Sequence, residues 1–383
     1  MSASHSRLAR APENLRNPLV VMLACIGVLA FMGLASGVSA APPGEAWSKM
    51  GLHCIHLGLG LGCFLVCFSL PTESFRRFGP ALILLVFLVL VAMKLVPGFG
   101  HESHAAVRWI ALGPFLLQPS VFLQFLWPAV LASWAAHDPL RLTQAGEVWK
   151  VILILGVVSV PILLQPDLGS VVILAGATGM ILLFAGTPLV VLRPLVFFLI
   201  GALVLMMFLF DHVDSRLSSF ISGEPGFQLQ RAQEAFAAGG LTGVGPGQGV
   251  LKNGFVPEGD TDFILALLAE EWGMFGTLLV WSLFVVFTLM GMRVVRRARC
   301  RYGAVLMAAA VLMISMQAAL NMAVVTGMVP PKGLPLPFVS RGGSSIISLS
   351  ALLGLAVRAV IEKRRSKVTV SELIQWTESN ALG

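Results

Sequence analysis

Long apolar runs recur from near the N-terminus almost to the C-terminus, and they constrain this chain more than any other feature. About ten runs approach the ~20 residues with which an α-helix crosses a bilayer. Hydrophobic residues make up 57% of the chain and charged residues only 12%, whereas soluble domains carry about 25% charged residues. We therefore predict an all-α, polytopic membrane protein. The runs cover roughly residues 18–38, 51–71, 79–96, 115–136, 148–165, 168–186, 189–210, 263–292, 303–328 and 337–361.

Lys and Arg residues predict the topology, because they accumulate in cytoplasmic loops. If the N-terminus lies inside and ten spans alternate, most of the 26 Lys and Arg residues fall on the inner side, and both termini are cytoplasmic. The net charge of +7 then reflects topology and contact with anionic lipid, not nucleic-acid binding. The predicted organisation is a tail at 1–17, a membrane domain at 18–362 with a large extracytoplasmic loop at 211–262, and a tail at 363–383.

The segment VSAAPP, which follows the first apolar run, resembles a signal-peptide cleavage site. Residues 1–40 are therefore either a signal peptide or an uncleaved anchor. The run is longer than the usual 7–15 apolar residues of a signal peptide, which favours the anchor.

Acidic residues gather where the loop meets the span at 263–292, in the stretch PEGDTDFILALLAEEWG. Asp262 lies at this boundary. It could serve as an acidic residue at the helix N-terminus, or as a general base or cation-binding carboxylate in a cleft of low dielectric. Glu258 and Asp260 would shape the electric field beside it.

Glu270 and Glu271 lie about two turns deeper in the same predicted helix. Ionisable residues at that depth usually face the bundle interior and are paired. Adjacent helical positions point about 100° apart, so both glutamates cannot serve one site equally. We interpret them as structural or proton-tuning residues.

Three basic residues, Arg108, Lys332 and Arg341, lie close to apolar spans on the predicted outer face. Taken singly, each is typical of a residue that contacts lipid headgroups. Together with a carboxylate-bearing helix, they also suit stabilisation of a leaving pyrophosphate.

The remaining motifs are less specific. GGLTGVGPGQG could cradle phosphate, but it fits no dinucleotide or P-loop spacing and is better explained as a flexible loop. RGGSS would allow either close approach of a ligand or tight helix packing. Asp167 in QPDLGS is typical of a helix cap. The His and Cys residues show no metal-binding spacing.

Five segments taken together resemble the SEDS family (shape, elongation, division and sporulation), to which FtsW, RodA and SpoVE belong. They occur in the family's order between residues 108 and 345: RWIALGPFLLQPS, LLQPDLGS, FQLQRAQEAFAAGGLTGVGPGQGVLK, PEGDTDFILALLAEEWG and GMVPPKGLPLPFVSRGGSS. The PPKG sequence resembles the division-type members, which favours a role in septal synthesis over one in elongation.

The resemblance implies a peptidoglycan glycosyltransferase that polymerises lipid II, a disaccharide-pentapeptide on undecaprenyl pyrophosphate, at the outer face of the cytoplasmic membrane. Asp262 would be its essential aspartate, as a general base or as a ligand of a divalent cation such as Mg or Mn. A class B penicillin-binding protein and other divisome or elongasome membrane proteins would be its partners. The implied substrate-binding residues are Arg108, Gln118, Asp167, Lys252, Lys332, Arg341 and Ser344.

The chain departs from the family pattern at Val121 and Gln124, which stand where a Glu and a Lys are usual. Losing both is physically coherent, because losing one would leave an unpaired charge. Arg341 replaces a common Tyr, and we hypothesise that it supplies the missing positive charge. Asp260 replaces a frequent His, which favours a cation ligand. Two other functions stay open, a lipid II flippase and a divisome scaffold without catalytic activity.

Overall fold

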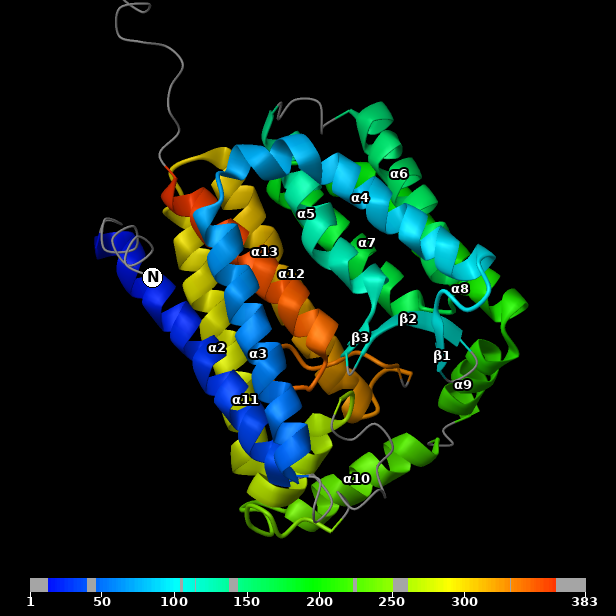
Figure 1. The fold of residues 1–383 in the computed structure, drawn as a ribbon, viewed down its shortest axis with the longest axis vertical. Coiled ribbons are helices and arrows are strands. Elements are labelled where there is room, and N and C mark those ends of the chain that lie inside the picture. Colours follow the sequence, from blue (N-terminus) through cyan, green and yellow to red (C-terminus); the bar gives the residue numbers. More distant parts are fainter. Residues whose placement is uncertain are drawn as a thin grey trace, which may run out of the picture.

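Helices make up nearly all of the structure (Figure 1). The computed structural model describes residues 13–39, 46–103, 106–113, 115–137, 144–222, 226–250, 261–330 and 332–362. The predicted all-α fold is confirmed. The helices are α2 (Glu13–Ser39), α3 (Ala46–Ser69), α4 (Thr72–Leu95), α5 (Pro119–His137), α6 (Ala145–Leu163), α7 (Leu168–Phe184), α8 (Arg193–Leu209), α9 (Asp211–Ser222), α10 (Phe227–Gly239), α11 (Ile264–Arg296), α12 (Arg301–Val325) and α13 (Gly343–Ile361).

The apolar helices correspond to the spans expected from the sequence. Within the described ranges, nine helices are long and apolar enough to cross a membrane, and α7, with 17 residues, is a shorter apolar helix. Together they match the ten apolar runs, and the chain is a multi-pass membrane protein. The side of the membrane on which each loop lies stays a prediction.

Burial divides the spans into a central and a peripheral set. In α13, 83% of the apolar segment is buried, compared with 72% in α5 and 67% in α12, but only 22% in each of α3, α4 and α8. Figure 1 shows α12 and α13 near the centre, α2, α3 and α11 along one side, and α4, α6 and α8 along the other. Large apolar side chains on the periphery, such as Phe208 at 85% exposure, are suited to contact with lipid.

A small antiparallel sheet, which the sequence did not predict, precedes α5. Its strands are β1 (His101–Ser103), β2 (Ala106–Leu112) and β3 (Phe115–Leu117), in the order β1-β2-β3. The span predicted at 115–136 therefore begins as a strand, and its helix starts only at Pro119. Periodicity alone cannot separate a short apolar strand from the first turn of an apolar helix, which explains the difference.

The segment 211–262 also contains regular structure, namely α9 and α10. Buried residues in α10 recur at intervals of three or four, at Leu229, Ala232, Ala235 and Gly239, as expected for a helix that packs on one face. That face contacts α11. Residues 223–225 and 251–260 of this segment lie outside the described residues.

The helices α3 and α13 approach most closely at Gly354. A Cβ atom added at this glycine would overlap the main-chain carbonyl of Phe64 in α3. Small residues permit such close backbone contact between membrane helices. The position of α13, which begins beside the candidate site, therefore depends on this glycine.

We expect Gly354→Ala to lower the free energy of unfolding by about 1–3 kcal/mol, because the added methyl group forces the two helices apart. Thermal unfolding in detergent would show this as a lower Tm. Gly62→Ala on α3 is the matched control, since a Cβ there meets no atom within 4 Å. Equal Tm values for the two variants would contradict the close packing.

Candidate active site

Two segments that are far apart in the sequence meet at Asp262. This residue precedes α11, whose N-cap is Phe263 and receives no side-chain hydrogen bond. Residues 332–342 form a loop, although part of this range was expected to belong to the last span. A Cβ atom added at Gly333 would lie 2.8 Å from the Asp262 Oδ2 atom. Glycine at position 333 therefore lets the loop pass directly over the carboxylate.

Asn321 of α12 joins these two segments. Its Nδ2 atom donates to the main-chain oxygen of Asp262 at 2.8 Å and to that of Leu334 at 2.5 Å. The side chain is 1% exposed, so these hydrogen bonds form away from water and hold strongly. Asn321 thus fixes the backbone of Asp262 relative to the 332–342 loop.

Gln317, one turn earlier on α12, makes the same kind of link further along the loop. Its Nε2 atom donates to the main-chain oxygen of Pro335 at 2.9 Å and to the Ser345 Oγ atom at 3.3 Å. The sequence interpretation missed both amides. Their spacing of four residues within an apolar span was the available signal, because polar residues in a span usually face the bundle interior.

Gln118, Asp167 and Ser344, all expected at the site, form one connected hydrogen-bond chain. Asp167 caps α7 as predicted, accepting from the Ser170 main-chain nitrogen at 3.1 Å and from the Ser170 Oγ atom at 2.6 Å. Gln118 donates from Nε2 to Asp167 Oδ2 at 3.2 Å and from its main-chain nitrogen to Ser344 Oγ at 3.0 Å. The chain links the starts of α5, α7 and α13.

Lys332 lies against the same turn. A Cβ atom added at Gly169 would lie 2.8 Å from Lys332 Cε and 3.3 Å from Asp167 Oδ1. The side chain of Lys332 therefore extends over the start of α7, while the next residue, Gly333, covers Asp262. This places an ammonium group and two carboxylates around one short stretch of backbone.

Arg108 lies at the edge of this group and is engaged with the main chain. Its Nε atom donates to the carbonyl of Gln165 at 2.6 Å, and its Nη2 atom donates to the carbonyl of Pro166 at 2.8 Å. These bonds tie β2 to the turn between α6 and α7. The structure thus gives Arg108 a role in holding the Asp167 turn.

The helix α11 breaks at Gly273, which has φ 65° and ψ −161°. An unbroken α-helix would pair the Met274 nitrogen with the Glu270 carbonyl and the Phe275 nitrogen with the Glu271 carbonyl. Instead, the glycine-rich loop that follows α10 pairs with all of these groups. The hydrogen bonds run from Met274 N to Gly240 O at 3.0 Å, Phe275 N to Leu241 O at 3.3 Å, Val244 N to Glu270 O at 3.0 Å and Gly245 N to Glu271 O at 3.0 Å.

The side chains of Glu270 and Glu271 are 2% and 4% exposed at this break. Glu270 accepts through Oε1 from the main-chain nitrogen of Val250 at 2.7 Å. A Cβ atom at Gly249 would lie 2.8 Å from Glu270 Oε2, so the loop lies directly on the carboxylate. The loop is held by α11, contrary to the expectation of a flexible segment.

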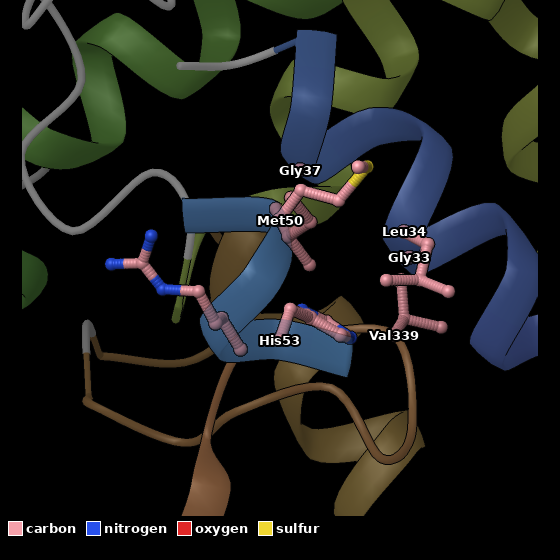
Figure 2. Close-up of a pocket in the computed structure, with 8 residues that line it drawn as sticks. Gly33, Leu34, Gly37, Met50, His53 and Val339 are labelled. Carbon is pink, nitrogen blue, oxygen red and sulfur yellow. The ribbon is translucent and has the colours of Figure 1, made fainter. Parts of the chain in front are cut away.

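Arg341 lies at the far end of the 332–342 loop. It lines a small pocket together with Val339 and with His53 of α3 (Figure 2). The hypothesis that its charge compensates for the residues at 121 and 124 stays a prediction.

Val121 and Gln124 are buried in α5, with 7% and 3% exposure. The Val121 carbonyl accepts from Ser348 Oγ at 2.8 Å. Among the described residues, the Gln124 Oε1 atom has no hydrogen-bond partner. The protein thus carries neither charge of the family's usual pair at these positions, and α5 instead bonds to α13 through its main chain.

Other expected residues cannot be placed. Lys252, Glu258 and Asp260 lie outside the described residues. Within the part of the chain that is described, no group of three or more His, Cys, Asp or Glu residues is arranged to hold a metal ion. Asp262 as a metal ligand stays a prediction.

We expect Gly273→Ala to loosen the glycine-rich loop, because alanine does not adopt this backbone conformation without a cost of about 1–3 kcal/mol. Its Cβ would also lie within 2.6 Å of main-chain atoms of the loop. Hydrogen–deuterium exchange should show faster amide exchange at 243–250. In the control, Gly201→Ala on α8, the Cβ meets no atom within 4 Å. Unchanged amide exchange at 243–250 in Gly273→Ala would show that the contact between the loop and α11 does not depend on this glycine.

Comparisons with known proteins agree on one family. The family model for FtsW, RodA and SpoVE, described as cell cycle protein, matches residues 15–365. A probable peptidoglycan glycosyltransferase FtsW from Saccharophagus degradans is 31% identical over 356 residues, which cover 90% of this chain and 92% of the relative. The protein of the same name from Marinobacter nauticus is 34% identical over 355 residues, covering 90% of this chain and 88% of the relative.

Solved structures share the fold. A chain from a structure of a peptidoglycan synthase complex aligns with a TM-score of 0.71 at 22% identity, covering 90% of this chain and 98% of that one. Rod shape determining protein RodA from Thermus thermophilus aligns with a TM-score of 0.63 at 22% identity, covering 89% of this chain and 94% of that one. Since the family model spans nearly the whole sequence and relatives above 30% identity match along most of their length, this chain belongs to the FtsW/RodA/SpoVE family.

Proposed function

We propose that this membrane protein is a peptidoglycan glycosyltransferase that polymerises lipid II at the outer face of the cytoplasmic membrane, in septal wall synthesis. The relatives at 31% and 34% identity carry the name of this enzyme class. The observation that carries the proposal is the Asp262 carboxylate, which lies against Gly333 at the entrance of a membrane helix. Lys332, the residue before Gly333, lies at the Asp167 turn.

Asp262 is suited to act as the general base. Glycan extension requires a sugar hydroxyl of the acceptor to attack the anomeric carbon of the donor, and the hydroxyl must lose its proton as the new bond forms. A positioned carboxylate contributes about 10²–10⁴-fold to such a step. The proton passes to the Asp262 carboxylate, and undecaprenyl pyrophosphate leaves with the electron pair of the broken bond.

Lys332 is suited to stabilise the pyrophosphate as it leaves. Negative charge develops on the leaving group in the transition state, and fixed cations in a site of low dielectric lower its energy most effectively. Lys332 Cε lies against the start of α7, and the next residue, Gly333, lies against the Asp262 carboxylate, which supports a role for this cation beside the base. Arg341, at the other end of the loop, is proposed as a second cation for the substrate.

Asn321 and Gln317 give this arrangement its rigidity. Both amides bond to the main chain of the loop, and Asn321 also bonds to the main chain of Asp262. A displacement of about 1 Å at a reacting group can cost about 10²-fold in rate. We assign both residues as positioning residues that hold the base and the loop in register.

A divalent cation is compatible with the site but is not required by it. Mg²⁺ is commonly bound by one or two protein carboxylates together with substrate phosphates, and Asp262 would supply such a carboxylate. When bound, the ion would neutralise charge on the pyrophosphate. The other acids of the segment, Glu258 and Asp260, lie outside the described residues.

The proposed partner is a class B penicillin-binding protein, which would cross-link the strands. The proposal rests on the family and on the PPKG sequence that contains Lys332, which resembles division-type members. A likeness at 22% identity to a chain of a peptidoglycan synthase complex supports the shared fold.

A scaffold without catalytic activity is the second candidate. The observation that favours it is the uncharged, buried pair Val121 and Gln124, since a base without its usual cationic neighbour is a weaker catalyst. Lys332 and Arg341 are the alternative sources of that charge.

The Asp262→Ala variant should abolish polymerisation of purified lipid II by the protein with its penicillin-binding partner, because the attacking hydroxyl loses its base. The transpeptidase activity of the penicillin-binding partner is blocked, and the glycan strands are resolved on gels. Mg²⁺ is supplied or withheld in parallel. Asp262→Asn controls for shape without charge. Strands from Asp262→Ala would refute the role of this residue, and no strands from the wild type with the complex intact would favour the scaffold.

Replacing Lys332 by Met should lower turnover at saturating lipid II by about 10²-fold, the typical cost of losing one transition-state donor. The control is Lys94→Met, which removes an exposed cation in the last turn of α4. Similar turnover in the two variants would remove Lys332 from the reaction.

A further inference from the structure

A small pocket lies behind the 332–342 loop, between the ends of α2 and α3 (Figure 2). One side is formed by Gly33 and Gly37 of α2. His53 of α3 lines it next, and Figure 2 shows its ring directed towards Val339 of the loop. The pocket therefore joins two outer helices to the loop that carries Lys332 and Arg341.

The pocket also reaches the residues around Asp262. Its remaining walls include Ile264, two residues after Asp262 at the start of α11, and Arg341. Both segments of the candidate active site, the start of α11 and the 332–342 loop, thus line the pocket. A group bound in this pocket would contact both segments.

His53 is an unusual residue for this position. It is 2% exposed, and neither ring nitrogen has a hydrogen-bond partner among the residues that the structure describes. A neutral imidazole carries one N–H donor and one acceptor nitrogen. Leaving both without partners inside a protein is costly, so a polar group is expected in the pocket beside the ring.

The pocket has room for a single water molecule. Its volume is about 10 Å³, at the lower limit of what one water requires, and much less than a phosphate or a sugar ring needs. A buried water also needs two to four polar partners. Besides His53, the carbonyl of Gly37 lies in the last turn of α2, where carbonyls have no partner within the helix, and the carbonyl of Val339 lies against Gly33.

We propose that His53 binds one structural water in this pocket and that the pair acts as a positioning element for the active site. The water connects α2 and α3 to Val339. It thereby fixes the 332–342 loop, whose Gly333 covers Asp262. The role in the reaction rests on the proposed function, whereas the effect on the position of the loop does not.

The two glycines of α2 leave room for this pocket. A Cβ atom at Gly33 would overlap the Val339 carbonyl, so α2 is in direct contact with the loop there. A Cβ atom at Gly37 meets no atom within 4 Å.

Two variants separate the role of the water from general packing. His53→Phe keeps an aromatic ring and removes both nitrogens, whereas His53→Gln keeps a donor and an acceptor. Gly27→Ala on α2 is the control, because a Cβ there meets no atom within 4 Å and the residue does not line the pocket.

Two measurements are made on the full-length protein in complex with its penicillin-binding partner. Hydrogen–deuterium exchange of peptides covering 332–342 should be faster in His53→Phe than in the wild type. Turnover of lipid II should fall by about tenfold in this variant, with KM unchanged, because the catalytic groups are displaced and not removed. His53→Gln and Gly27→Ala should resemble the wild type in both measurements.

The outcomes are distinct. Wild-type exchange of 332–342 in His53→Phe would overturn the proposal. So would a loss of turnover in His53→Phe that His53→Gln does not restore, since hydrogen bonding would then not be the reason. If the wild type makes no glycan, the proposed function fails, but the exchange measurement still decides whether His53 and the water position the loop.

Discussion

The break in α11 at Gly273 is the constraint that fixes the first turns of this helix, at whose start Asp262 lies. A break inside a membrane protein exposes main-chain groups that lipid cannot satisfy. Here the glycine-rich loop after α10 supplies the missing donors and acceptors, and it pairs with the carbonyls of Glu270 and Glu271. The first turns of α11 are consequently fixed to α10 as well as to the bundle. Asp262 precedes a short helical segment that is held from two sides.

Much of the fold and part of the site follow from the sequence alone. The spans are predictable because apolar length is a local property, and the cap at Asp167 is predictable because its signal lies within four residues. The strands before α5 and the helix α10 were not predicted. Short apolar or alanine-rich segments between spans carry weak periodicity, and their structure depends on neighbours such as α11.

The contacts within the site explain why other parts could not be predicted. Arg108 as a substrate-binding residue stays a prediction, and nothing in the sequence indicated that two of its donors bond to the carbonyls of Gln165 and Pro166. Asn321 was overlooked, although it joins the Asp262 backbone to the loop. In both cases the partner is a main-chain oxygen contributed by another helix or turn. A sequence shows which side chains carry donors, but the acceptors that they find depend on tertiary structure.

The length of α7 has a consequence for the surrounding bilayer. With 17 residues, this helix extends only about 26 Å at ~1.5 Å per residue, whereas the hydrocarbon core of a typical bilayer is ~30 Å thick. The mismatch is met by local thinning of the membrane or by an end that stays below the headgroups. Asp167 and Lys332 lie at one end of α7. Under either adjustment these two polar groups lie closer to the bilayer midplane than the ends of a full-length span do.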